Sequence, residues 1–454
     1  MPSIIATSNG AHNYILGYAA LTSILLSITL ALQAIDAMLL GRTIGSRKGR
    51  THIRRQRRSL TSLRNEYGYL FNRAYRMDHA AFQKLYKILK NGIMEYLAQE
   101  STGDSFYVPN GPIDCQVRLA MALRYFAGGS YLDILMSHGV GKTDFYNSVW
   151  AVVHAVNNAN ELMLQFPQTI EECAATANEF AARSKAGFNN CVGCIDGVLL
   201  WIEKPGKKEC ATVGVDSGKF YCGRKGKYGL NMQAVCDAQR RFTFVSIQHP
   251  ASASDYLSFA TSTLHTRLTE SSPLPKGYCL YGDNAYINEP FMAVPFPNQG
   301  KGPKDDYNYF HSQVRINIEC AFGILTNKWR LLKSPLSSKL SIKKISALTF
   351  CLCKLHNYCI DNGNAKVPSR YQHDSLTLMD FANVIDKENG EMIPVGLLGG
   401  GDHFEDIQGG RRGASIRPIR SQRRQFDTEE LPRTTMLRHV VEQDIHRSQP
   451  IQPK

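Results

Sequence analysis

Three acidic residues stand in distinctive local sequences in this chain of 454 residues. Asp196 lies in Gly-Cys-Ile-Asp-Gly-Val, Asp283 in Leu-Tyr-Gly-Asp-Asn-Ala-Tyr, and Glu319 in Ile-Asn-Ile-Glu-Cys-Ala-Phe-Gly. Their carboxylate oxygens are the ligands that hard divalent cations prefer, with Mg2+ favoured and Mn2+ a workable substitute. Two such ions about 3.5 to 4 Å apart can activate an attacking water or 3′-hydroxyl and stabilise the leaving oxygen of a phosphodiester. The three acids therefore predict a two-metal site that cuts and rejoins phosphodiester bonds.

The spacing of apolar residues predicts the strands that must carry two of these acids. Four short β-rich runs are predicted strands, the first three forming a meander: 191–202, 230–236, 242–248 and 278–282. Alternation along the first strand places Asp196 on the face opposite Ile195 and Leu199, where a carboxylate needs a cation or hydrogen-bond donors. The fourth strand ends at Asp283, where the small Gly282 leaves room for an ion and a phosphate.

Two helices are predicted to flank the fourth strand. Ser254 can cap a helix over 255–268. After a polar, Pro-rich loop at 295–306, an apolar stripe with steps of three and four predicts an amphipathic helix that carries Glu319 beside its buried seam. The stripe consists of Val314, Ile318, Phe322, Leu325, Trp329 and Leu332. We therefore predict an α/β domain over 187–363, in which helices flank a mixed sheet.

The segment 59–186 has helical periodicity and is predicted to form an all-α domain. Asp78 can cap its first long helix. Short helices at 117–126 and 131–136, a Gly-containing turn at 138–141, and a third helix capped by Thr143 follow the order of a helix-turn-helix. The third helix would present Lys142 and Asn147 to a major groove, but an ordinary corner of a helical bundle explains the pattern equally well.

The two ends of the chain have unusual compositions. Residues 14–35 carry no charge and are long enough to cross a bilayer, and 42–58 are rich in Lys and Arg without an acid. Because 14–35 also hold several Ser, Thr, Gly and Gln, we favour a packed helix over a membrane span, followed by a nuclear-import or phosphate-binding run. We assign 1–58 to this apolar and basic region. Residues 364–454 are predicted to form a largely disordered basic tail with a helix near 437–445.

The net charge of the chain indicates the kind of partner it binds, and its cysteines indicate the compartment in which it works. A net charge of +14 and a pI of about 9.2 attract polyanions, of which nucleic acid is the commonest. The 12 cysteines are scattered through apparent strands and helices, as expected for reduced thiols in the cytosol or nucleus. Cys191 and Cys194 form a Cys-x-x-Cys, but no second pair follows at zinc-site spacing, so we interpret them as buried thiols.

A basic segment between the first two predicted strands is a candidate for contact with phosphates. Lys204, Arg224 and Lys225 are the members that we single out, and Lys207, Lys208, Lys219 and Lys227 accompany them. Cations at this place could hold the phosphates that flank a scissile bond. A solvated basic loop is an equally simple interpretation for any one of them.

Several other polar residues have structural interpretations. Arg315 precedes the third acid by one helical turn and can orient that carboxylate. His356 and Asn357 are predicted to buttress a core helix, since a two-metal mechanism requires no His. Asp237 and Asp255 stand at a turn and at a helix start, where acids suit the backbone.

The local sequences around these residues resemble those of the PIF/Harbinger family of DNA transposases and their domesticated relatives. The resemblance spans roughly 75–361. It is carried by Tyr75-Arg76-Met77, Gly193 to Asp196, Lys204-Pro205, Arg224-Lys225-Gly226, Asn231, Asp237, Ser252, Asp255, Gly282-Asp283, His311-Ser312, Arg315, Ile318-Glu319, Phe322-Gly323, Leu325, Trp329-Arg330 and Leu355-His356-Asn357. It implies an RNase H-like nuclease domain in which Asp196, Asp283 and Glu319 form a DDE triad.

The resemblance also implies an activity and a setting. A transposase of this kind would cut the ends of its element and join them to target DNA, with two Mg2+ ions as cofactors. Its expected partners are double-stranded DNA, a Myb-like DNA-binding protein and further copies of the chain, in the nucleus rather than at a membrane. The alternative is a domesticated, catalytically idle DNA-binding or scaffold protein. The presence of all three acids favours activity.

Overall fold

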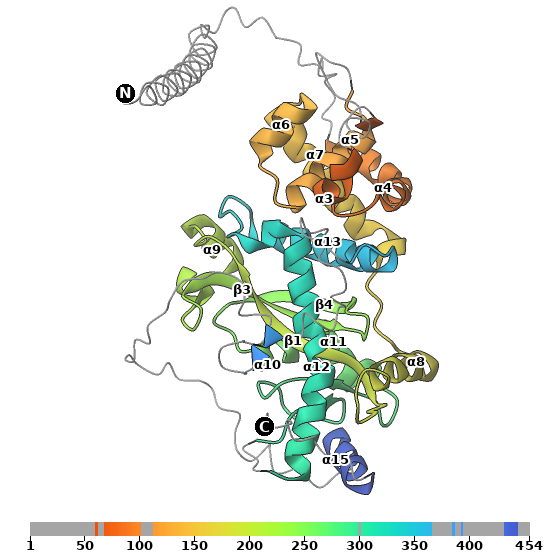
Figure 1. Cartoon of the computed structure of the whole chain (residues 1–454). Helices are drawn as coiled ribbons and strands as arrows, with labels where there is room; N and C mark the ends of the chain where they lie inside the picture. The colour runs from red at the N-terminus through yellow and green to blue at the C-terminus, as the bar shows by residue number, and fades with distance from the viewer. Residues whose placement is uncertain are drawn as a thin grey trace, which may run out of the picture. The chain divides into compact units, whose positions relative to one another are not determined.

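The computed structural model describes residues 60–61, 68–100, 112–297, 301–365, 384–385, 392–393 and 431–443 (Figure 1). The predicted apolar helix at 14–35, the basic run at 42–58 and most of the tail lie outside these residues. Within the described part, no helix is both long enough and apolar enough to span a membrane.

Within residues 68–190, apart from the undescribed 101–111, six α-helices precede the sheet. They are α3 (Phe71–Tyr75), α4 (His79–Glu100), α5 (Cys115–Phe126), α6 (Tyr131–His138), α7 (Lys142–Asn158) and α8 (Ile170–Ala181). Helices α4 and α5 both pack on α7, and their apolar faces form one core. Asp78 caps α4 as predicted, because its Oδ1 accepts a hydrogen bond of 2.8 Å from the backbone N–H of Ala81. The helical periodicity of this segment thus corresponds to packed helices.

The turn between α6 and α7 differs from the prediction at one point. Thr143 does not cap α7, which begins one residue earlier, at Lys142, after the extended Gly141. Gly139 ends α6 in the left-handed region, with φ 64°, and its N–H bonds back to Leu135. The two glycines therefore set the turn through backbone conformation rather than through a side-chain cap. A DNA-binding role for this unit stays a prediction.

The central sheet has the strand order β4-β3-β1-β5-β6, with β2 beside β3. Its strands are β1 (Cys191–Trp201), β2 (Tyr221–Cys222), β3 (Lys227–Cys236), β4 (Phe242–Pro250), β5 (Cys279–Tyr281) and β6 (Met292–Ala293). Pairs β1–β3 and β3–β4 are antiparallel, whereas β1–β5 and β5–β6 are parallel. The four predicted strands are confirmed, and this mixed order is consistent with an RNase H-like DDE fold.

Helices cover both faces of this sheet. The long α12 (Pro303–Lys328) lies along β1 and contacts β3 and β5 (Figure 1). A separate apolar cluster on the opposite face includes Ile195 and Val235 from the strands, Cys173 from α8 and Phe259 from α10 (Asp255–Ala260). Successive residues of a strand point to opposite faces, which is why β1 contributes to both clusters.

Two predicted helix boundaries were wrong. Helix α12 begins inside the predicted loop, because Pro303 suits its first turn and Asp305 and Asp306 favour the positive end of its dipole. The predicted helix 255–268 is interrupted: Ser254 caps α10, and Ser262 caps a separate α11 (Thr263–Thr266), which continues as the π-helical η4 (Arg267–Ser271).

Helix α13 (Ile342–Asp361), which follows α12 and η5, joins the sheet to the preceding helices. It packs on α7 and β4, and the hydroxyl of Tyr358 donates to the carbonyl of Ala81 at 2.7 Å. His356 lies 2.8 Å from the carbonyl of Arg240, and the Asn357 side chain bonds both backbone groups of Phe242. The predicted buttressing role of His356 and Asn357 is confirmed.

Short elements complete the described chain. They are η1 (Gly68–Leu70), η2 (Asn160–Leu162), α9 (Lys207–Val213), η3 (Ser217–Phe220), η5 (Arg330–Lys333), β7 (Val384–Ile385), β8 (Met392–Ile393) and α15 (Pro432–Glu442). Strands β7 and β8 pair antiparallel as a separate two-stranded sheet. The last helix begins before the predicted 437–445 and packs on α12, with Pro432 in its first turn.

Candidate active site

Asp196 and Asp283 are positioned by the parallel pairing of β1 with β5. Cys194 pairs with Tyr281, and each acid comes two residues later on its own chain segment. Because side chains alternate between faces with a period of two, this offset brings both carboxylates to the same face. The side-chain Oδ1 of Asp283 is held by the N–H of Ala285 at 2.9 Å, in the loop that follows β5.

Glu319 reaches the same place from α12. The thiol of Cys194 donates to the carbonyl of Val314 at 3.2 Å, which fixes this helix against β1 next to Asp196. Arg315, one turn before Glu319, contacts two of the acids: its Nη2 lies 2.7 Å from Glu319 Oε1, and its Nη1 lies 3.8 Å from Asp196 Oδ2. The guanidinium therefore connects the helix acid to the strand acid.

The three acids influence one another electrostatically. The pKa of Asp196 is raised to about 7 by burial, by the Asp283 carboxylate and, more weakly, by Glu319. The N–H of Gly197, 2.8 Å from Asp196 Oδ1, and the charge of Arg315 oppose this rise in pKa. Burial acts to lower the pKa of Arg315, yet the surrounding carboxylates raise it. A cluster of this kind favours any cation that can enter it.

The acids suit a metal by their chemistry, but they are not arranged as a finished metal site. Three partly exposed carboxylates form a hard, all-oxygen donor set. Across the described ranges, however, no group of three or more His, Cys, Asp or Glu side chains is arranged to hold a metal ion. Arg315 bridges Asp196 and Glu319 instead, so a guanidinium balances part of their charge.

A polar network lies on the other face of β1, behind Asp196. Asp255 Oδ1 accepts hydrogen bonds from the side chains of Asn231 and Gln233, each at 3.0 Å. The hydroxyl of Tyr286 donates to Gln233 Oε1 at 2.6 Å. A Cβ on Gly197 would overlap the carboxylate of Asp255 and the amide of Gln233, so only glycine fits beside this network.

Sequence reasoning missed most of this network. Asp255 does more than begin a helix, because Ser254 is the capping residue and the Asp255 side chain turns to the sheet. Gln233 and Asn231 were a detectable signal, because they are polar residues at alternate positions of the predicted apolar strand 230–236, and the structure buries both. Tyr286 gave no such signal in the sequence. Asp237 has a structural role, as its Oδ2 pairs with Arg241 Nε at 2.7 Å.

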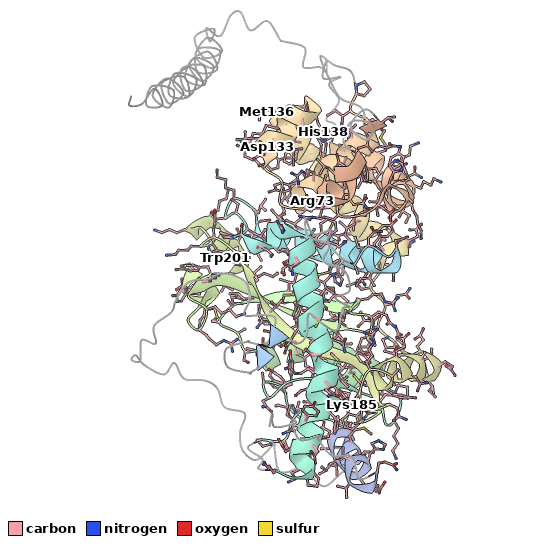
Figure 2. All side chains as sticks on the ribbon, viewed as in Figure 1. Arg73, Asp133, Met136, His138, Lys185 and Trp201 are labelled. Carbon is pink, nitrogen blue, oxygen red and sulfur yellow. The ribbon has the colours of Figure 1, made fainter. Side chains whose placement is uncertain are left out.

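The predicted DNA-contacting residues lie on exposed segments. Arg224 and Lys225 are in the tight turn between β2 and β3, and Lys204 follows β1. Trp201 marks the end of β1 in Figure 2, and its ring lies 4.1 Å from the Nζ of Lys227. Lys142 and Asn147 are exposed on α7. In the described part of the chain, none of the five predicted residues forms a hydrogen bond or ion pair with the three acids.

All 12 cysteines are free thiols, which agrees with the interpretation of Cys191 and Cys194. Both are buried, and each thiol lies within hydrogen-bonding distance of a backbone carbonyl, at 3.5 Å from Gly193 and 3.2 Å from Val314 respectively. They therefore pack in the interior of β1 as buried thiols.

A comparison with known protein families finds a similarity over the segment that contains the three acids. Residues 195–357 match a family model described as DDE superfamily endonuclease, and this span includes Asp196, Asp283 and Glu319. This segment is similar to DDE endonucleases. The similarity supports a DDE transposase-like family and a nuclease or transposase function in general, with DNA as the molecule acted on. No curated protein and no solved structure matches the chain.

Proposed function

We propose that this protein is a DNA transposase of the PIF/Harbinger type, which cuts the ends of its element and joins them to target DNA. The observation that carries the proposal is the meeting of an aspartate on β1, an aspartate just after the parallel β5 and a helix glutamate, inside a segment similar to DDE endonucleases. Pairwise contacts through Arg315 tie Glu319 to Asp196. The local sequence resemblance supplies the finer family assignment.

Asp196, Asp283 and Glu319 are the residues that would hold the divalent cations, two Mg2+ ions or Mn2+ in their place. When bound, such ions activate the nucleophile and stabilise the leaving oxygen in phosphodiester chemistry. The protein supplies the carboxylates, buries most of Asp196, and holds Glu319 in orientation through Arg315. Asp196 has a pKa of about 7, so its proton must leave before it can serve as a full anionic ligand.

DNA would be held by cationic surfaces outside the acidic site. The exposed Lys204, Arg224 and Lys225 are proposed to contact phosphates, and α7 is proposed to bring Lys142 and Asn147 to a groove. We further propose a nuclear location, a Myb-like DNA-binding partner and a homo-oligomer that holds two element ends together. The net charge of +14 supports the affinity for DNA but not these finer partners.

The rival function is a domesticated, catalytically idle DNA-binding or scaffold protein. One observation favours it: Arg315 already bridges two of the acids. Purified protein incubated with labelled element ends, in Mg2+ or in chelator, separates the two functions. The transposase cleaves only with the metal, whereas the idle protein binds the same DNA and leaves it intact under both conditions.

A further inference from the structure

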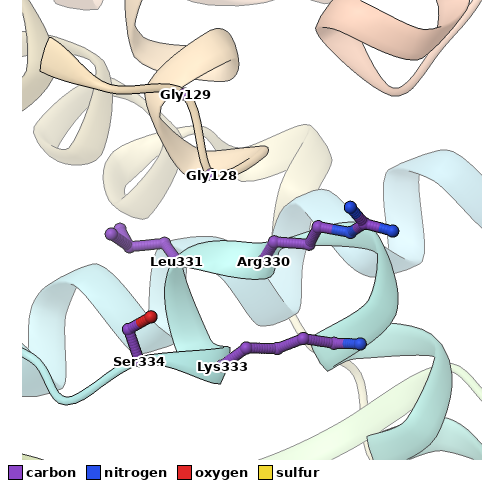
Figure 3. A pocket seen from close by; sticks show the side chains of 6 residues that line it. All are labelled: Gly128, Gly129, Arg330, Leu331, Lys333 and Ser334. Atoms are coloured by element: carbon purple, nitrogen blue, oxygen red, sulfur yellow. The ribbon is translucent and has the colours of Figure 1, made fainter. Parts of the chain in front are cut away.

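A second site candidate lies away from the acids, where the turn after α5 meets η5. Figure 3 shows this pocket, a cavity of about 560 Å³ lined by Gly128, Gly129, Arg330, Leu331, Lys333 and Ser334. Gly128 has a φ of +92°, and a Cβ there would lie 2.8 Å from the Cβ of Arg330. The glycine turn therefore permits the close approach of η5. The Arg330 and Lys333 side chains extend to the same side of η5 (Figure 3).

A buried arginine stands behind these two exposed cations. Arg76 is only 7% exposed, and its Nη2 donates to the carbonyl of Ala127, the residue before the glycine turn, at 3.0 Å. Its Nε is buried and has no hydrogen-bond partner. Such an unsatisfied donor costs about 1 to 3 kcal/mol unless a ligand accepts from it. The Nε of Arg76 is thus an unsatisfied hydrogen-bond donor near the glycine turn of the pocket.

The backbone at Arg76 is also held in an unusual conformation. Its φ is 65°, in the left-handed region that residues other than glycine rarely adopt. The fully buried Lys328, at the end of α12, donates from Nζ to the carbonyl of Arg76 at 2.8 Å. The last turn of α12 therefore fixes Arg76, and Arg330 follows two residues later. One helix end organises both cations.

Like charges gather here without an acid to balance them. Burial, and then the charges of Arg330, Arg124 and Arg73, lower the pKa of Arg76 to about 10. Burial also lowers the pKa of Lys333, and the positive charges of Arg330 and Arg76 contribute to this lowering. In the described residues, none of these five cations forms an ion pair with a carboxylate. An anion is the natural counterpart of such a cluster.

We propose that the pocket lined by Arg330 and Lys333, with Arg124 and the buried Arg76 behind it, is a binding site for phosphate groups of the DNA backbone. The lining offers cations, N–H donors and a glycine turn, with Leu331 as its only large apolar member. Because no aromatic ring lines the cavity, it suits phosphates rather than nucleobases. The proposal rests on the proposed function only in its choice of DNA as the source of the phosphates.

The position of the pocket relative to the acids fits one continuous duplex. Glu319 and Lys328 are on the same helix, and an α-helix rises about 1.5 Å per residue, so the pocket end of α12 lies about 14 Å along the axis from Glu319. Duplex DNA advances about 3.4 Å per base pair. A duplex cut at the acids would therefore present phosphates to this pocket a few base pairs from the cut.

The test uses the full chain with the double substitution Arg330→Gln and Lys333→Gln, both at exposed positions. The matched control is Lys185→Gln with Lys276→Gln, which removes the same charge from exposed positions elsewhere. Affinity for a labelled duplex is measured by fluorescence anisotropy in chelator, over a series of salt concentrations. We expect the pocket variant to bind about tenfold more weakly, with a salt slope smaller by about 2, and the control to bind nearly as the parent.

Two outcomes would overturn the proposal. Equal loss of affinity in both double variants would show general electrostatic attraction only. If inorganic phosphate raises the Tm of the parent but not of the pocket variant, while DNA affinity is the same in both, the pocket serves a small free anion and not DNA. Failure of the nuclease function would look different, since the parent would then bind duplex normally and cleave none of it in Mg2+.

Discussion

Arg315 and Glu319 are one turn apart on α12, and the guanidinium Nη2 of the first lies 2.7 Å from the carboxylate Oε1 of the second. An exposed pair at this spacing usually contributes little to stability. Here the pair is only partly exposed, and the same guanidinium also lies 3.8 Å from Asp196. Arg315 therefore acts on the relative position of two proposed ligands and on the protonation of Asp196, which gives it a role that helix stability alone would not.

The Arg315→Gln variant tests that role. Arg315 lowers the pKa of Asp196, so its loss should raise that pKa further. The Asp196 carboxyl group would then become anionic only at a higher pH. We expect Mg2+-dependent cleavage at pH 7 to fall about tenfold, and the rate profile to move toward alkaline pH. The Arg315→Lys variant, which keeps the charge, should keep most of the parent's profile. A Gln variant with a lower rate but an unshifted profile would contradict the electrostatic role.

The Asp283→Asn variant separates chemistry from binding. The change removes a proposed metal ligand but touches no proposed phosphate contact, so cleavage should be abolished while the duplex Kd stays within about twofold. The metal-free variant should be as stable as the parent or more so, because Asp283 repels Asp196 at the empty cluster. Cleavage assays and thermal melts in chelator provide the readouts. Cleavage equal to that of the parent would refute the site, and a large drop in Tm would mark Asp283 as structural.

The raised pKa of Asp196 predicts how stability depends on pH in chelator. Its folded pKa of about 7 lies above its unfolded value of about 3.9, so the folded state binds the proton more tightly. The resulting stabilisation is complete below about pH 4 and is lost as pH rises through 7. Between about pH 4 and pH 7, this loss lowers the free energy of unfolding by a few kcal/mol. Urea unfolding of the Asp196→Asn variant should therefore show a weaker decline between pH 5 and pH 8 than the parent shows; an identical decline would contradict the assignment.

The sheet was predictable because its strands have strong local signals. Continuous apolar runs flanked by turn residues marked four strands, and the alternation within β1 gave the correct face for Asp196. The pairing of β1 with β5 could not be predicted from local sequence, because residues 191–201 and 279–281 are far apart in the chain and meet only in the folded structure. Strands β2 and β6, of two residues each, are too short to show any periodicity.

The basic pocket shows the limit of reading a sequence segment by segment. Arg76, Arg124 and Arg330 come from three distant segments, and none stands in a run of like charges. What unites them is the contact of Lys328 with the backbone of Arg76 and the close approach of η5 to Gly128. By contrast, the visible basic segment around Lys204 and Arg224 forms an exposed hairpin and helix with no described contact to the acids.

Gly197 offers a test of the network behind the acids. A methyl group there would overlap the Asp255 carboxylate and the Gln233 amide, whereas Gly223 has open space around its Cβ position. Overpacking of this kind costs about 1 to 3 kcal/mol, so Gly197→Ala should lower the free energy of unfolding by that amount. Because the displaced network lies directly behind Asp196, cleavage should fall by more than the change in folded fraction explains. Gly223→Ala is the matched control and should change neither quantity. Urea unfolding and cleavage like those of the parent in the Gly197→Ala variant would show that the network shifts at little cost in free energy and does not position Asp196.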